Sequence, residues 1–269
     1  MTEEQKEIQK LIKMLKGDED YHDFETADDY FEFWERKTEK YREEVAEKNK
    51  DAVYELIAQK RVNANRWISA FGEYARPLGK DSKEIYKFYV ELFSENKIPV
   101  EVQFPLFMNV YAHYPVEKGF NKYLLEAYDN FPEKKKDKLR KDIYDELWDC
   151  REDDGYLKVY RGEYIEAEFG SSIEISQAIS FTMDYEKARF FACRWSPKKA
   201  NIYTVKVAFE DIIYYTNERN ESEVIIRPKS KDRKFPDLKC EVLNPEEYYK
   251  GNTAIVNEAR LRMAIEHGM

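Results

Sequence analysis

Two glutamates, Glu221 and Glu223, are separated by one residue and lead directly into the apolar run Val224-Ile225-Ile226. Such a run of β-branched residues predicts a strand. Because side chains alternate between the two faces of a strand, both carboxylates are expected to point into the same space. Like charges this close repel one another, so the pair belongs either at a solvated strand edge or in a site that uses carboxylates for chemistry.

Two further motifs lie upstream, each at the end of a predicted strand. Arg161-Gly162 ends the first strand, and Ser180-Phe181-Thr182 ends the second. Each is ordinary when taken alone, because an arginine at a strand end is commonly a solvated charge and Ser-Phe-Thr is common strand sequence. Along the chain the three motifs follow the order Arg, Ser-x-Thr, Glu-x-Glu.

The elements that must position these residues change in character near residue 150. Before it, apolar residues recur at helical spacing, most clearly at residues 82–96, where Ser82 is expected to cap the helix, and at residues 139–148. Thr26 predicts the start of another helix. Residues 1–150 are therefore predicted to form an all-α domain, with a role in binding the acceptor or a partner.

After residue 155 the chain becomes rich in Val, Ile, Tyr and Phe, which favour strands. The predicted strands cover residues 157–161, 178–181, 201–209, 223–227 and 238–243. A helix is predicted at residues 184–194, and a C-terminal helix at residues 253–267. The fold class is therefore α+β, and residues 151–269 are predicted to form a second domain built on two packed sheets with few helices.

Composition limits the class of protein. The net charge of −9 and the pI of about 5.2 argue against general adhesion to nucleic acid or to an anionic membrane. No apolar stretch approaches the roughly 20 residues of a membrane span, and the N-terminus lacks a secretory signal, so we expect a cytoplasmic protein without a membrane partner. Three widely spaced cysteines, Cys150, Cys193 and Cys240, fit a reducing compartment, and the scattered histidines predict no metal site.

Taken together, the three motifs resemble the R-S-E class of mono-ADP-ribosyltransferases. The resemblance covers roughly residues 156–243, because Ser180-Phe181-Thr182 and the helix after it look like the family's second strand and helix, and residues 221–228 look like its catalytic strand. It implies an ADP-ribosyltransferase-like two-sheet core, NAD as the substrate and a macromolecular acceptor, which is either a protein arginine or RNA or DNA. The chain is also similar to bacterial toxin–antitoxin and phage-defence toxins, for which an antitoxin would be a partner.

The resemblance assigns catalytic roles to three residues. Cleavage of nicotinamide from NAD places oxocarbenium charge on the ribose, and a fixed carboxylate stabilises that charge. Glu223 would be this carboxylate, and Ser180 would hold it in register through a hydrogen bond. Glu221 would take the proton of the acceptor as the acceptor attacks the sugar.

Four residues would bind NAD in this scheme: Arg161, Gly162, Thr182 and Tyr160. Arg161 would hold the pyrophosphate through its planar fork of donors, for which lysine is a poorer substitute. Gly162 would let the backbone approach the nicotinamide amide, because no Cβ intervenes. Thr182 would support the same wall of the site. The aromatic residue that stacks on nicotinamide stays open among four candidates: Tyr156, Tyr160, Phe169 and Tyr185.

The segment before the two acids, residues 210–220, would be the acceptor-recognition loop, with Tyr214, Tyr215 and Arg219 as its contacts. After the catalytic strand comes a basic run at residues 227–234, which is either a solvated loop or a rim that contacts the phosphates of a nucleic-acid acceptor. The Glu-x-Glu form favours an arginine acceptor, whereas the basic run favours nucleic acid.

Two other functions compete with transfer. In an NAD glycohydrolase, water would replace the acceptor and the product would be free ADP-ribose. In a non-catalytic protein, the helical domain would bind a partner and the second domain would be a degenerate scaffold.

Overall fold

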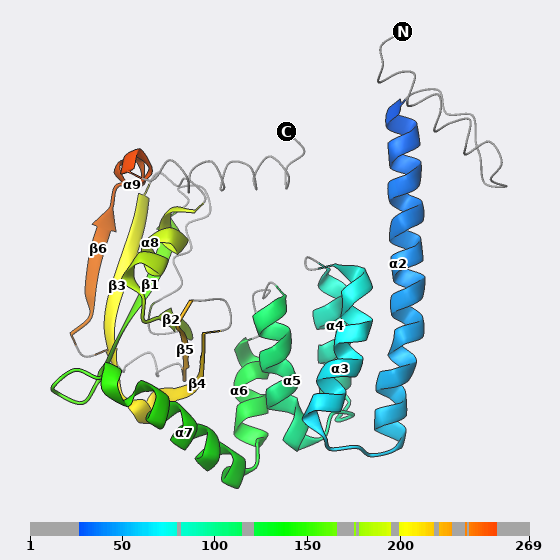
Figure 1. Ribbon diagram of the computed structural model, residues 1–269, viewed down its shortest axis with the longest axis horizontal. Helices are drawn as coiled ribbons and strands as arrows, with labels where there is room; N and C mark the ends of the chain where they lie inside the picture. Colours follow the sequence, from blue (N-terminus) through cyan, green and yellow to red (C-terminus); the bar gives the residue numbers. More distant parts are fainter. Residues whose placement is uncertain are drawn as a thin grey trace.

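The computed structural model describes residues 27–79, 82–114, 121–165, 175, 178–194, 199–217, 221–227, 235 and 237–251. Helices come first along the chain, and a six-stranded sheet follows them (Figure 1). The helices before the sheet are α2 (Ala27–Ala58), α3 (Ala64–Ala75), α4 (Lys83–Ser94), α5 (Val100–His113), α6 (Asn121–Asn130) and α7 (Glu133–Leu147). Two shorter helices, α8 (Tyr185–Cys193) and α9 (Pro245–Gly251), follow β2 and β6. The predicted α+β class is therefore confirmed. The C-terminal helix predicted at residues 253–267 lies outside the described residues.

Local signals explain where the helices begin. The Ser82 side chain accepts a hydrogen bond from the backbone N–H of Glu84, which caps α4 as predicted. Asn63 caps α3 in the same way by accepting from the N–H of Arg66. The helix predicted at residues 139–148 is the second half of the longer α7.

The core of the helical half is aromatic and centres on α4 and α5. Phe71, Phe88 and Tyr89 lie buried in it, and the rings of Phe71 and Phe88 stack with centroids 5.7 Å apart. Helix α5 is buried around much of its circumference, which is typical of a helix covered on both sides. Figure 1 shows α5 and α6 between the sheet and the α3–α4 pair, with α2 outermost and extending beyond its neighbours.

The strands form one hydrogen-bonded antiparallel sheet with the order β4-β5-β2-β1-β3-β6. Their bounds are β1 Leu157–Ile165, β2 Ser180–Thr182, β3 Lys199–Val207, β4 Ile212–Thr216, β5 Glu223–Ile226 and β6 Lys239–Leu243. The prediction of two packed sheets is therefore wrong for the described residues. However, β1 and β2 are paired only at Tyr160 and Thr182. This short pairing is a seam between two three-stranded halves: the first two motifs lie on its two strands, and the third lies at the start of β5, the next strand beyond β2.

The helical half and the sheet share hydrophobic contacts. Ile179, Ile213 and Ile225 belong to the same buried cluster as the α3–α6 side chains. In the other direction, Ile143 and Leu147 of α7 pack with the opposite face of the sheet. The predicted boundary near residue 150 therefore separates helices from strands along the chain, but the two parts are packed together.

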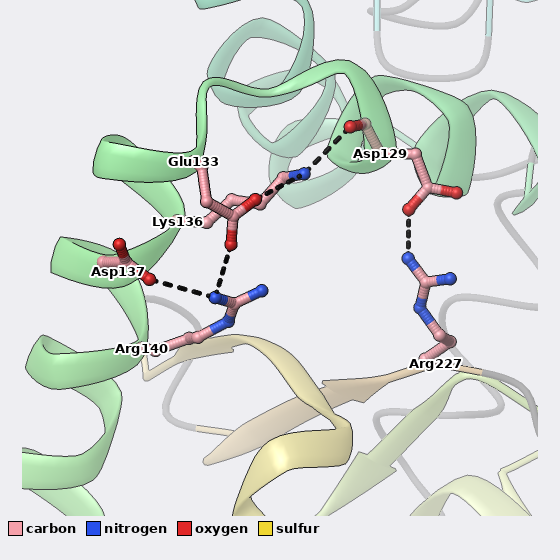
Figure 2. Close-up of polar contacts among 6 residues, drawn as sticks. All are labelled: Asp129, Glu133, Lys136, Asp137, Arg140 and Arg227. Carbon is pink, nitrogen blue, oxygen red and sulfur yellow. Dashed lines mark hydrogen bonds and ion pairs between the residues drawn. The ribbon is translucent and has the colours of Figure 1, made fainter.

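Ion pairs add a polar connection at the corner between α6 and α7 (Figure 2). The Asp129 carboxylate pairs with Arg227, which directly follows β5, while its backbone carbonyl accepts from Lys136 Nζ at 2.8 Å. Glu133 pairs with Lys136 at 3.4 Å and with Arg140 at 2.8 Å. Since the side chains of Arg227 and Asp129 are about half exposed, we expect little stabilisation from that pair alone.

The three cysteines give a simple test of this packing. Cys193 is buried on α8 (Tyr185–Cys193), and burial raises the pKa of its thiol to about 11, whereas Cys150 and Cys240 are exposed. At pH 8 the Cys193 thiol is therefore protonated as well as covered, and only thiolates react with disulfide reagents. We expect two fast-reacting thiols in the native protein and a third after unfolding. Three fast thiols in the native state would contradict the packing of α8, and Cys193→Ser should leave the fast count at two.

No helix in the described part of the chain combines the length and the apolar character needed to cross a bilayer.

Candidate active site

Three strands bring the three motifs together through a chain of hydrogen bonds. Arg161 Nη1 on β1 donates to the backbone carbonyl of Ser180 on β2 at 2.8 Å. The Ser180 hydroxyl donates to Glu223 Oε1 on β5 at 2.5 Å. The hydrogen bond predicted between Ser180 and Glu223 is therefore present, and residues from three different strands lie within one site.

Glu223 is a buried carboxylate with a second hydroxyl donor. Glu223 is only 6% exposed. Tyr111 Oη of α5 donates at 2.7 Å to Glu223 Oε1, the atom that also accepts from Ser180. Two donors on one oxygen fix the rotation of the carboxylate and satisfy part of its need for hydrogen bonds in a buried position. Tyr111 was not among the residues predicted from the sequence.

Glu221 does not share the strand with Glu223. β5 begins at Glu223, and Ser222 has a left-handed backbone with φ of 45°, which breaks the alternation of side chains. The expectation that the two carboxylates lie on one strand face is therefore wrong. Asn217 stabilises the turn, because its Oδ1 accepts from the backbone N–H of Ser222 at 3.0 Å and from the Ser222 hydroxyl at 3.3 Å.

Thr182 connects this turn to β2. Its hydroxyl donates to the backbone carbonyl of Glu221 at 2.5 Å and accepts from the N–H of Asp184 at 3.0 Å. Asp184 in turn caps α8, which confirms the helix predicted at residues 184–194. Thr182 is buried and directly opposite Glu223 in the β2–β5 register, so it holds the wall of the site beside the acid.

Arg161 is oriented by a second acid that the sequence interpretation did not include. Arg161 Nε and Glu163 Oε1 form an ion pair at 2.8 Å, and the Glu163 side chain is 9% exposed. Oε2 of Glu163 is buried, and no described residue bonds to it. The bonds to Glu163 and Ser180 use two of the five N–H donors of the guanidinium and fix the direction of the fork. The i, i+2 spacing on a strand was the signal that could have found this pair.

The structure gives Gly162 a different physical reason from the one predicted. A Cβ at this position would lie 1.8 Å from the backbone oxygen of Ala188 and 2.8 Å from the backbone nitrogen of Ala192. The absent side chain therefore faces α8, and glycine is required so that this helix can pack on β1. The proposed approach of nicotinamide does not explain the glycine on this face of the strand.

Tyr160 and Tyr185, two candidates for the stacking aromatic, contact each other. Their rings meet edge to face with centroids 5.4 Å apart. The Tyr185 hydroxyl donates to Glu241 Oε2 at 2.7 Å. Burial, and to a smaller extent this hydrogen bond, raise the pKa of Tyr185 to about 12. Tyr156 is partly buried, and Phe169 lies outside the described residues. The choice of stacking residue among them stays open.

The predicted acceptor loop is largely regular structure. Residues 212–216 form β4, and their two tyrosines pack against the two hydrophobic clusters rather than standing in a loop. The ring of Tyr214 contacts Phe104 of α5 with centroids 6.1 Å apart. Tyr214 and Tyr215 therefore lie on a strand and not in the predicted loop, and their rings are only partly buried. Their contact with an acceptor stays a prediction. Arg219 lies outside the described residues, as does the basic run after Arg227.

In the described residues, no group of three or more His, Cys, Asp and Glu side chains is arranged to hold a metal ion.

Comparisons of the chain with protein-family models, with curated proteins and with solved structures find no match.

Proposed function

We propose that this protein is a mono-ADP-ribosyltransferase, which transfers ADP-ribose from NAD to a macromolecular acceptor. One observation carries the proposal: Arg161, Ser180 and Glu223, which the motif order singled out, are linked by hydrogen bonds of 2.8 and 2.5 Å across three strands. A buried carboxylate with a fixed orientation can stabilise the cationic sugar of the transition state, and an oriented guanidinium beside it can bind the pyrophosphate of NAD.

In this mechanism Glu223 acts on the sugar as nicotinamide departs. Positive charge develops on the ribose in the transition state, and a carboxylate whose rotation is already fixed needs no reorganisation to stabilise it. Ser180 contributes through Glu223, because its hydroxyl donates to the carboxylate at 2.5 Å. NAD itself supplies the bond that breaks, between the ribose and nicotinamide.

Arg161 binds the NAD pyrophosphate in this proposal, and Arg161→Lys tests it. The ion pair with Glu163 directs the guanidinium, and a lysine cannot reproduce its planar fork. We expect NAD affinity to fall by roughly 10-fold, measured by calorimetry, with the fold retained as judged by circular dichroism. Arg76→Lys in the helical half, where Arg76 pairs with Glu73 at 3.0 Å, is the matched control and should keep wild-type affinity. Equal affinities for wild type and Arg161→Lys would remove Arg161 from the NAD site.

Glu221 is the proposed base for the acceptor. Departure of nicotinamide does not need an acceptor, whereas attack by a neutral nucleophile needs a base. Glu221→Gln should therefore retain nicotinamide release and lose about 100-fold in transfer. The two reactions are measured in parallel, as released nicotinamide and as labelled acceptor. A proportional fall in both would mean that the two acids act as one unit, and normal transfer would exclude Glu221 from the reaction.

NAD glycohydrolysis is the second candidate, and one observation favours it. Tyr214 and Tyr215, the aromatic residues expected to contact an acceptor, are engaged in packing. Mass spectrometry of the products separates the two reactions. A mass increase on protein or RNA supports transfer, whereas free ADP-ribose without any tagged macromolecule supports hydrolysis. A failure to bind NAD at all would leave the non-catalytic, partner-binding function.

A further inference from the structure

We propose that Tyr111 is a positioning residue for Glu223, so that the helical half of the chain completes the active site. This inference rests on the proposed function, because it assigns Tyr111 to the carboxylate that acts on the sugar. The contact joins residues 112 positions apart in the chain, from α5 to β5, at 2.7 Å. It gives the helical half a role in positioning the Glu223 carboxylate, which its sequence does not indicate.

The hydrogen bond is well placed to set the geometry of the acid. A tyrosine hydroxyl donating to a carboxylate is a charge-assisted bond, stronger than one between neutral partners. Tyr111 and Ser180 donate to the same Oε1 atom from different elements, one from α5 and one from β2. Two donors that converge from separate directions leave the carboxylate little freedom to rotate.

Helix α5 is held firmly enough to present this hydroxyl. Within it, Phe104 contacts Tyr214 of β4 and the ring of Tyr128 on α6. The side-chain amide of the buried Gln103 donates to the backbone carbonyl of Ile98 at 3.0 Å, and the backbone carbonyl of Gln103 accepts from the Tyr89 hydroxyl at 3.1 Å. A donor on a packed helix is more accurately positioned than one on a loop.

The consequence is specific to the chemical step. Tyr111 contacts Glu223, the acid proposed to stabilise the transition state. Arg161, the residue proposed to bind NAD, lies on a different strand, β1. Removal of its hydroxyl should therefore lower kcat without raising the KM for NAD, since an interaction used mainly in the transition state affects kcat. A merely structural contact would instead lower the unfolding midpoint and reduce the active fraction.

The test is Tyr111→Phe, which removes only the hydroxyl, measured by the rate of nicotinamide release at several NAD concentrations. We expect kcat to fall about 10-fold at unchanged KM. The matched control is Tyr74→Phe, which also loses one hydroxyl hydrogen bond in the helical half, from Tyr74 Oη to the carbonyl of Glu84 at 3.1 Å. The control should keep wild-type kcat, and thermal unfolding of both variants corrects for any loss of stability.

A double-mutant cycle makes the inference sharper. If Tyr111 acts through Glu223, then Tyr111→Phe should cost no further activity in a Glu223→Gln background, because the group that it positions is no longer a carboxylate. Independent, multiplicative losses would overturn the positioning role, as would wild-type kcat in the single variant. An inactive wild type would overturn the proposed function together with this inference, whereas an active wild type with an unaffected Tyr111→Phe would overturn the inference alone.

Discussion

Glu223→Gln should lose at least about 100-fold in nicotinamide release while keeping its fold and its affinity for NAD. The change is nearly isosteric and preserves an oxygen that Ser180 and Tyr111 can still reach, since both donate to Oε1 in the native protein. What it removes is the negative charge beside the developing oxocarbenium ion. The measurement is kcat for nicotinamide release, together with NAD affinity by calorimetry.

Glu73→Gln is the control for this substitution. Glu73 is an exposed acid of α3 that pairs with Arg76 at 3.0 Å, far along the chain from the three motifs. It should keep wild-type turnover. If the purified, folded Glu223→Gln variant turned over at the wild-type rate, Glu223 would not be the catalytic carboxylate.

Gly162→Ala should destabilise the protein by about 3 kcal/mol or more, at the upper end of what overpacking costs. The added Cβ would lie 1.8 Å from the backbone oxygen of Ala188, and a helix backbone cannot move aside as the end of a flexible side chain can. Either α8 shifts away from β1 or the seam between β1 and β2 opens. Denaturant unfolding followed by circular dichroism measures the loss.

Gly72→Ala is the matched control, because, apart from its chain neighbours and the backbone of its own helix, nothing lies within 4 Å of a Cβ built at Gly72 in α3. Alanine is a better helix former than glycine, so this variant should gain about 0.5–1 kcal/mol. The two glycines are thus expected to respond to the same substitution with opposite signs. A neutral Gly162→Ala would contradict the close packing of α8 on β1.

Helices α2, α4, α7 and α8 and most strands were predictable because their signals are local. Ser82 and Asp184 stand where helices α4 and α8 begin, and both cap them in the structure. The run after Glu223 is a strand, as its β-branched residues predict. The order of the three motifs correctly indicated that Arg161, Ser180 and Glu223 lie near one another.

The features that could not be predicted depend on single backbone angles or on distant contacts. Ser222 carries no sequence signal for its left-handed conformation, which moves Glu221 off the strand. Residues 212–216 form a strand that pairs with β5, and each of its two tyrosines packs partly against one of the two hydrophobic clusters. A segment rich in tyrosine gives no indication of these distant partners. The contact of Tyr111 with Glu223 spans the two halves of the chain, and no local spacing in the sequence indicates it.

The transfer of ADP-ribose is tested most directly by incubating the purified protein with NAD labelled in its adenylate part, cell lysate proteins and total RNA. We expect label to enter protein or RNA with the wild type and not with Glu223→Gln, and one nicotinamide to be released for each ADP-ribose transferred. A wild-type protein that leaves every macromolecule unlabelled, or labelling that persists undiminished in Glu223→Gln, would contradict the proposed transfer.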